Sequence, residues 1–544
     1  MTRRRRILAL AAGVALVAGH AAALPWLMDR LDRAPLVVRV RAPLVAPGAA
    51  LSLAAVDVPP DAAARARLFI DGEDVAAVPA AGAVYVARPP GLHHIEWRAR
   101  YRGGVERRVG WTQLAGPFQD PAHPPCGARL LVGQRFLDDG RAGPGTMAHL
   151  VAGLVDREMS GFEAFPVGTF ERVRAIAMRW VSPAGGDAGH LRVSLAFGFT
   201  HAVLDLTIRI APHLAGGQLR LSSRTDARVH LRSRVVQWVS DLIHGDDIAA
   251  RMARGEITAT LDDIMTAPPP LPLGGGRALE LAYCADRDIE VVGDSHASVP
   301  LAVALGPAAA AARRAGRAAA PVLLPAEPGA VPAAAMTAPL AVELDGNALG
   351  GLLYVLWGTG YLEEALAASG IASRFDRDPV VRELLSVRAR GPALPLPPTL
   401  TASRRPGESY EIGVASSLSL EDGPQRTPAH IFGRAGFELT GTGAGRQPRL
   451  SLRDLGLTCE PEPGLLEPCY PELAAALIER APELHGQLSA WFGDLLTDLL
   501  IDRDIAPTGS GARFRLRQSV IVPPPPGRHG PLHIDLMGQL EATP

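Results

Sequence analysis

Residues Val342–Leu362 read VELDGNALGGLLYVLWGTGYL, and this stretch decides the fold of the chain. Its apolar side chains recur at helical spacing, which predicts a helix over 344–356 with one apolar face: Leu349, Leu352, Leu353, Leu356 and Trp357. Each glycine inside this helix costs about 1 kcal/mol relative to alanine, so propensity alone does not hold it. Burial must hold it, and a tryptophan offers the largest apolar surface. We therefore expect Trp357 to be a core anchor or a wall of an apolar pocket.

The element order around this helix occurs twice along the chain. The first copy is predicted to contain a short helix, three strands, a long helix and two final strands, at 146–157, 191–199, 204–210, 219–221, 235–265, 278–283 and 289–292. The second copy repeats that order with one further strand, at 344–356, 399–402, 411–420, 436–439, 450–452, 471–501, 514–522 and 532–540. The order predicts a structural duplication, with modules at 125–305 and 337–544 joined by an Ala/Pro linker at 306–336.

Both long helices carry an apolar stripe with a period of three or four residues. Such a stripe packs against a sheet as core, and it can also line a lipid cavity between the helix and a curved sheet. Pro482 is expected to break or kink the first turns of the second helix. The side chains that we expect to contact lipid are Trp238, Leu242, Leu353, Trp357, Leu488, Trp491 and Leu495.

Residues 34–118 differ from the two modules, because they predict short strands separated by turns. The clearest strand lies within Pro90–Tyr101, where polar and apolar side chains alternate. This segment predicts a small β-sandwich that resembles bacterial immunoglobulin-like domains, which usually serve as spacers or adhesion modules.

The N-terminus predicts export. Arg3–Arg6 form a basic segment, an apolar run follows from Ile7, and small residues end it at Ala23. This is the pattern of a signal peptide over 1–23. The alternative is an uncleaved membrane anchor that extends to about residue 28. Both readings place the rest of the chain outside the cytoplasm, in the periplasm or the extracellular space.

The four cysteines are an even number in an exported protein, which permits two disulfides. Cys459 and Cys469 flank a turn-rich segment that can close locally, which leaves Cys126 and Cys284 to pair at long range. The alternative is two buried free thiols. A metal site is not expected, because no histidine cluster or Cys-x-x-Cys spacing accompanies these residues.

Charge excludes one class of partner. The chain has 55 basic residues, all arginine, and 56 acidic residues, so no basic excess is available to neutralise nucleic-acid phosphates. The net charge is −3 over 119–305, −5 over 306–544 and +3 over 34–118.

Enzyme motifs are weak. Gly293-Asp-Ser295 resembles the nucleophile block of an esterase, but the Asp-x-x-His segment that would supply a base near the C-terminus is missing. Residues 441–446 lack the last glycine of a dinucleotide fingerprint, and the segment from Phe437 predicts a hairpin. We expect no catalytic residue, no metal and no cofactor.

Val342–Leu362 also resembles a pattern in the bactericidal/permeability-increasing and lipopolysaccharide-binding protein family of the tubular lipid-binding (TULIP) superfamily. The later Leu396–Thr401, followed by a strand pair, fits the same pattern, as does the tandem order of elements. The resemblance implies two modules, each with a long helix wrapped by a curved sheet around an apolar pocket for acyl chains. Two features depart from the family. Cys284 follows the first long helix, so the family's disulfide does not carry over, and the strongly cationic tips of some members are absent.

These observations predict an α+β protein, with an N-terminal β-sandwich followed by two tandem modules in which a long helix is wrapped by a curved antiparallel sheet. The expected function is that of an exported lipid-binding or lipid-transfer protein. Its partners would be phospholipid or another acyl-chain ligand and a membrane surface. The alternatives are a non-catalytic structural or adhesive surface protein and, third, an esterase or lipase that uses Ser295.

Overall fold

The structure is a computed structural model of the 544-residue chain. It describes residues 37–40, 44–45, 50–56, 66–77, 83–86, 91–100, 106–115, 120–123, 126–164, 167–185, 187–231, 268, 271–272, 278–315, 336, 338–368, 387–402, 410–422, 425–440, 447–463, 465–469, 486, 512–522 and 532–542.

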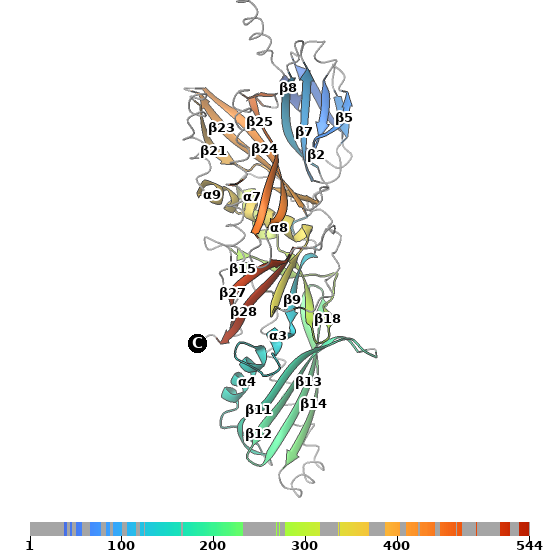
Figure 1. The fold of residues 1–544 in the computed structure, drawn as a ribbon, viewed down its shortest axis with the longest axis vertical. Helices are drawn as coiled ribbons and strands as arrows, with labels where there is room; N and C mark the ends of the chain where they lie inside the picture. Colours follow the sequence, from blue (N-terminus) through green and yellow to red (C-terminus); the bar gives the residue numbers. More distant parts are fainter. Residues whose placement is uncertain are drawn as a thin grey trace, which may run out of the picture.

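The described chain is built mainly from antiparallel sheets with few helices, which confirms the α+β class that the sequence predicts. Figure 1 shows an elongated molecule. A sheet from the first module lies at one end, a sheet shared by both modules lies in the middle, and the sheets of the second module and the front domain lie at the other end.

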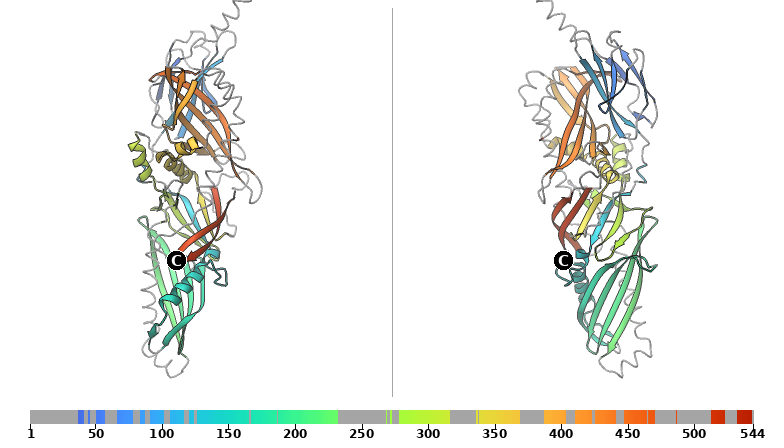
Figure 2. Two further views of the ribbon diagram at one scale, coloured as in Figure 1. Left: turned by 90° about the vertical axis from the view of Figure 1, so that its left-hand side faces the viewer. Right: turned by 45° about the vertical axis from the view of Figure 1, so that its right-hand side comes forward.

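The sheet of the first module has the strand order β10-β11-β12-β13-β14. Its strands are β10 (Glu163–Ala164), β11 (Gly168–Val181), β12 (His190–Phe199), β13 (Ala202–Ala215) and β14 (Gln218–Leu231). Period-two alternation predicts β12 and β13 and the start of β14, whereas β11 is not predicted. The helix α4 (Met147–Glu158) packs on β11 and is capped by the side chain of Thr146, which accepts a hydrogen bond from the backbone N–H of His149. Figure 2 shows α4 lying along this sheet.

The central sheet combines strands from the segments 125–305 and 337–544, in the order β17-β19-β9-β20-β28-β27. The first segment supplies β9 (Cys126–Gly133), β17 (Leu281–Tyr283), β19 (His296–Val303) and β18 (Glu290–Val292), which pairs with β19. The second segment supplies β20 (Leu340–Leu344), β27 (Ala512–Val522) and β28 (Leu532–Ala542). The strands β9 and β20 pair antiparallel, with Leu130 opposite Val342. The two segments therefore join through backbone hydrogen bonds.

The decisive stretch forms β20 and then α8 (Gly346–Gly358). Asp345 caps α8, because its carboxylate accepts hydrogen bonds from the backbone N–H groups of Asn347 and Ala348. The helix α9 (Tyr361–Ala368) follows. The start of the segment expected to be a linker forms a further helix, α7 (Gly306–Arg314), which packs against α8 through buried alanines. A four-residue helix, α3 (Gln134–Leu137), follows β9.

The sheet of the second module continues into the front domain, with the strand order β21-β23-β24-β25-β26-β1-β3-β6 and β22 paired to β23. From the second module come β21 (Val387–Ala393), β22 (Thr399–Ala402), β23 (Tyr410–Asp422), β24 (Gln425–Thr440), β25 (Gln447–Glu462) and β26 (Leu465–Pro468). From the front domain come β1 (Val37–Val40), β3 (Ala50–Val56) and β6 (Ala83–Val86). The pairing of β1 with β26 joins the two parts, with Val38 opposite Leu466.

A second front-domain sheet has the order β2-β8-β7-β4-β5. Its strands are β2 (Leu44–Val45), β4 (Arg67–Ile70), β5 (Glu73–Ala77), β7 (Gly91–Arg100) and β8 (Glu106–Ala115). It packs against the second module through a buried contact in which the Thr458 hydroxyl bonds to the backbone of Gly110. A two-stranded sheet of β15 (Leu271–Pro272) and β16 (Ala278–Leu279) completes the described strands.

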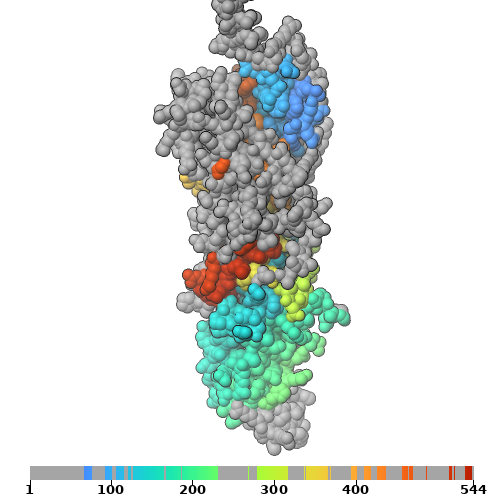
Figure 3. All heavy atoms as spheres, viewed as in Figure 1, coloured from blue at the N-terminus to red at the C-terminus, as the bar shows by residue number. Residues whose placement is uncertain are grey.

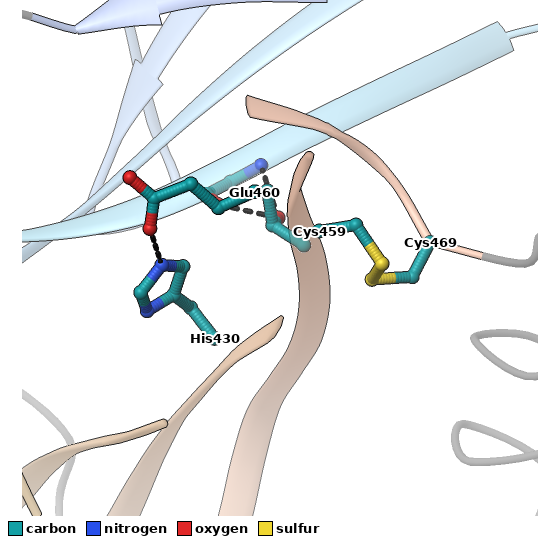
Figure 4. Close-up of a disulfide and its surroundings, with 6 residues drawn as sticks. His430, Cys459, Glu460 and Cys469 are labelled. Carbon is teal, nitrogen blue, oxygen red and sulfur yellow. Dashed lines mark hydrogen bonds and ion pairs between the residues drawn. A yellow bond between two sulfur atoms is a disulfide. The ribbon is translucent and has the colours of Figure 1, made fainter. Parts of the chain in front are cut away.

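Both expected disulfides are present, and the described chain contains no free cysteine. Cys126 at the start of β9 is bonded to Cys284 just after β17. Cys459 on β25 is bonded to Cys469, which directly follows β26 (Figure 4). The segment between these two, expected to be a turn-rich loop, is a tight hairpin of β25 and β26. The second disulfide therefore fixes the strand on which β1 pairs.

Three predicted segments lie outside the described residues: the N-terminal segment 1–23 and most of the long helices predicted at 235–265 and 471–501. Within the described residues, no helix is both long and apolar enough to span a bilayer.

Candidate functional site: the inner face of the first sheet

Side chains of the first sheet segregate by chemistry between its two faces. On the face that we call the inner face, four rows cross β11, β12, β13 and β14 in register. The rows are Trp180–Leu191–Ile210–Ser223, Met178–Val193–Ile208–Thr225, Ile176–Leu195–Leu206–Ala227 and Val173–Phe197–Leu204–Val229. The inner face is thus apolar on three strands and mixed on β14.

The burial pattern agrees with this division. On β14 the side chains alternate strictly, with Leu219, Thr225 and Val229 buried and the residues between them exposed or half-buried. The outer face carries charged and small polar side chains instead. Because period-two alternation extends over several strands, the sheet has one face for apolar contact and one for solvent.

Aromatic side chains gather toward one end of the inner face. Phe170 on β11 packs edge-on against Phe199 of β12, with ring centroids 5.7 Å apart. Phe197 lies 6.4 Å from the same ring. These rings and the apolar residues of the four rows form or pack against one buried cluster, which also includes Ala148 of α4.

Helix α4 packs against β11, the strand next to the short edge strand β10. Over β12, β13 and β14 the inner face consists mostly of apolar side chains, and most of these are buried, for example Leu206 at 1% and Ile208 at 2% exposure. An acyl chain or a helix from another part of the chain matches this surface chemically, because both present apolar groups to it.

Thr225 places a buried polar group on this surface. Thr225 is 7% exposed, and its hydroxyl oxygen has no hydrogen-bond partner. An unpaired buried hydroxyl costs about 1–3 kcal/mol relative to a paired one. Thr225 therefore marks a place on β14 where the inner face is not purely apolar.

The inner face is fixed to the central sheet at the end of β11. The indole Nε1 of Trp180 donates to the backbone oxygen of Val132 on β9, at 2.9 Å. The Gln134 side chain accepts from Trp180 N and donates to Met178 O, at 3.0 and 2.7 Å. The carboxylate of Asp138 accepts from Met178 N at 3.2 Å. These bonds hold the sheet in a fixed position relative to β9.

Of the residues expected to contact lipid, Leu353 and Trp357 are described. Trp357 is fully buried at 0% exposure, and its Nε1 donates to the backbone oxygen of Leu394 at 2.6 Å. Tyr354 packs beside it, with ring centroids 5.2 Å apart. Leu353 lies in the same core cluster. Trp357 is therefore a core residue, and the expected lipid contacts of Leu353 and Trp357 stay predictions.

The other five expected contacts, Trp238, Leu242, Leu488, Trp491 and Leu495, lie outside the described residues, so their role stays a prediction. The candidate site in the structure is instead the inner face of the first sheet, which the sequence analysis did not single out. The alternation of polar and apolar side chains in β12 and β13 could have indicated this face.

The side chain of Ser295, the candidate nucleophile, lies next to a histidine that could act as a base. Its hydroxyl oxygen lies 2.9 Å from Nδ1 of His296, the next residue. Burial lowers the pKa of His296, although nearby Glu343 and Glu290 oppose that shift. Within the described chain, no carboxylate is hydrogen-bonded to this imidazole, so the arrangement lacks the group that orients the base in a catalytic triad.

Among the residues that the structure describes, one group of side chains has the spacing of metal ligands: Cys126, Cys284 and Asp286, with ligand atoms within 4.8 Å of one another. The two sulfur atoms are bonded to each other, however, and a metal binds the thiolate form. This group is therefore a disulfide beside a carboxylate.

Comparisons with known proteins give a single kind of similarity. No family model and no curated protein matches the chain. Among solved structures, the chain is similar to one described as "Crystal structure of lipopolysaccharide binding protein". The two share 12% sequence identity with a TM-score of 0.32, over 77% of this chain and 99% of the other.

Proposed function

We propose that this protein is an exported carrier that holds the acyl chains of a lipid against the inner face of the first sheet. The observation that supports this most strongly is the set of four registered rows across β11–β14, which forms a broad apolar face with α4 packed against β11.

The mechanism is burial, without a chemical step. Each methylene moved from water into an apolar channel gains about 0.8 kcal/mol. Part of that gain offsets the loss of ligand freedom on binding, so a long acyl chain retains several kcal/mol of net affinity. Phospholipids meet this requirement, and transfer between membranes would follow from reversible burial.

Export is part of the proposal. The two disulfides support it, because disulfides persist in oxidising compartments such as the periplasm or the extracellular space. The basic and apolar N-terminal segment is the signal that would direct the chain there.

Two neighbouring serines on β14 allow a matched test. Ser223 belongs to the inner face and is half-buried, whereas Ser222 belongs to the outer face and is exposed. The variants S223C and S222C each add one thiol to a protein whose own cysteines are in disulfides. The rate at which a charged maleimide labels each thiol is measured on delipidated protein, before and after phosphatidylcholine is added.

The proposal predicts that lipid slows the labelling of S223C several-fold and leaves the labelling of S222C unchanged. Equal rates with and without lipid in S223C would contradict acyl-chain binding on this face. That result, combined with normal folding, would favour a solid β-rich spacer, the structural or adhesive class of protein.

A further inference from the structure

Four arginines form one row across the outer face of the first sheet. Arg179 on β11 is opposite Arg192 on β12, Arg192 is opposite Arg209 on β13, and Arg209 is opposite Arg224 on β14. Neighbouring strands are about 4.8 Å apart, so the row extends over roughly 14 Å. We call this row the arginine ladder.

The ladder lies within a wider basic surface. Strands β11–β14 contain eight arginines and three carboxylates, although residues 119–305 as a whole are slightly acidic. The other arginines of these strands are Arg172, Arg174, Arg220 and Arg228. The carboxylates are Glu171, Asp205 and Asp226. The positive charge of this module is therefore concentrated on one surface.

Few of the ladder's charges are neutralised by protein. Arg209 has an acidic partner, Asp226, at 3.7 Å. Arg179, Arg192 and Arg224 form no ion pair in the described structure. Arg179 and Arg224 are exposed, whereas Arg192 and Arg209 are half-buried. The Nε atoms of Arg192 and Arg209 are buried without a hydrogen-bond partner.

Folding alone does not account for the ladder. Like charges directly opposite each other on neighbouring strands destabilise a sheet. Three successive arginine pairs thus oppose the pairing of β11–β14. The next row, Ala177–Ser194–Thr207–Asp226, has one acid to offset them. An external anion that bridges several guanidinium groups would remove this repulsion and supply the missing acceptors.

The ladder lies near the central sheet, away from the distal end of the module. Arg179 is next to Trp180, whose backbone oxygen accepts from the N–H of Asp294, in the turn between β18 and β19. Figure 3 shows the first module in teal and green, directly beside the red strands β27 and β28 of the central sheet.

We propose that the arginine ladder docks the protein on a membrane surface that contains anionic phospholipid. A row of guanidinium groups on one face of an open sheet matches an array of lipid phosphates, because each arginine can contact a separate headgroup. This docking is independent of acyl-chain burial on the inner face, since the two groups of residues point to opposite sides of the sheet.

The test compares two triple variants of the full chain. R179Q/R192Q/R224Q removes the unpaired ladder charges and keeps the Arg209–Asp226 pair. The control, R100Q/R141Q/R314Q, removes the same charge from exposed arginines outside the first sheet. Binding is measured by co-sedimentation with vesicles of phosphatidylcholine alone or with about 30% phosphatidylglycerol, and stability by thermal unfolding.

Each arginine near an anionic membrane strengthens binding about five-fold, so the ladder variant should lose about a hundredfold in affinity for anionic vesicles. The control should lose much less. The melting temperature of the ladder variant should be equal to or higher than that of the wild type, because cross-strand repulsion is relieved. Salt at 0.5 M should reduce wild-type binding to the level of the variant.

Equal losses in the two triple variants would overturn the proposal, as would equal wild-type binding to neutral and anionic vesicles. The ladder variant could instead bind vesicles as the wild type does but no longer bind inorganic phosphate. That result would make the ladder a site for a soluble anion and would also overturn the proposal. Lipid carriage is judged separately by the S223C labelling, so either proposal can fail without the other.

Discussion

His533 on β28 lies opposite Glu343 on β20, and its Nδ1 is 3.1 Å from Oε1 of that carboxylate. The other ring nitrogen, Nε2, is 3.0 Å from the carboxylate of Asp535. Glu343 is only 1% exposed, and Arg129 on β9 lies 4.0 Å from its second oxygen. The imidazole therefore donates to two carboxylates inside the sheet that joins the two modules, and it does so in its protonated form.

This arrangement predicts a pH-dependent contribution to stability. Burial alone would lower the pKa of His533, but hydrogen bonds to Glu343 and Asp535 raise it above its ordinary value. A raised pKa in the folded state stabilises the protein fully below about pH 6.5. That contribution is lost as the pH rises through the folded-state pKa. The free energy of unfolding, measured in urea, should therefore decrease over this range.

The variant H533Q tests the pair directly. Its free energy of unfolding at pH 6 should be about 3 kcal/mol lower than that of the wild type, because the variant leaves a buried carboxylate without its cationic partner. It should also lose this part of the pH dependence. H230Q is the matched control, since His230 is exposed and is paired only with Asp205. Equal behaviour of the two variants would contradict the role of His533.

His94, at the contact between the front domain and the second module, should give the free energy of unfolding the opposite pH dependence. Its ring stacks on Phe432 with centroids 3.8 Å apart. Burial, with a smaller effect of Arg434, lowers the pKa of His94 to about 3. The unfolded chain therefore takes up a proton first as the pH falls below 6.5. Stability should fall by about 1.4 kcal/mol per pH unit in this range, and H94Q should lack this slope.

Trp357 is predicted to stabilise the core without contacting lipid. W357A should lower the free energy of unfolding by about 3–5 kcal/mol, because it removes a fully buried side chain. W357F should lower the free energy of unfolding by about 1 kcal/mol, since it removes the hydrogen bond to Leu394 and keeps an aromatic ring. Both should bind a fluorescent acyl probe as the wild type does at temperatures where they are folded. Lost probe binding in folded W357F would make Trp357 a pocket residue instead.

The two disulfides should differ in their contribution to stability. Their cysteines are separated by 158 and 10 positions in the sequence. In the chain-entropy model, the longer loop contributes about 5 kcal/mol and the shorter about 3 kcal/mol. Denaturation of C126S/C284S and C459S/C469S measures this difference. A larger loss in the short-loop variant would show that Cys459–Cys469 acts mainly by holding β26 against β1.

The sequence predicts those helices and strands in which the apolar side chains recur at a constant spacing over the whole element. The helix α8 and the strands β12 and β13 are of this kind. Strand β11 was missed because two irregularities, between Phe170 and Arg172 and between Val173 and Ala175, interrupt its alternation.

Features that depend on long-range contacts could not be predicted. The residues of α7 resemble a linker in composition, and the helix is stabilised by packing against α8. The pairing of β1 with β26 joins segments more than 400 positions apart, and neither strand indicates its partner. The four ladder arginines are irregularly spaced in the sequence, so only the strand register brings them into one row.

Lipid burial on the inner face is the central claim, and the lipid content of the purified protein tests it most directly. Protein isolated from its own host is extracted with organic solvent, and the extract is quantified by mass spectrometry against protein concentration. We predict at least one acyl-chain lipid per protein molecule, and recovery of that ratio when delipidated protein is incubated with phospholipid vesicles. An extract without stoichiometric lipid, together with no uptake from vesicles, would contradict the proposed function.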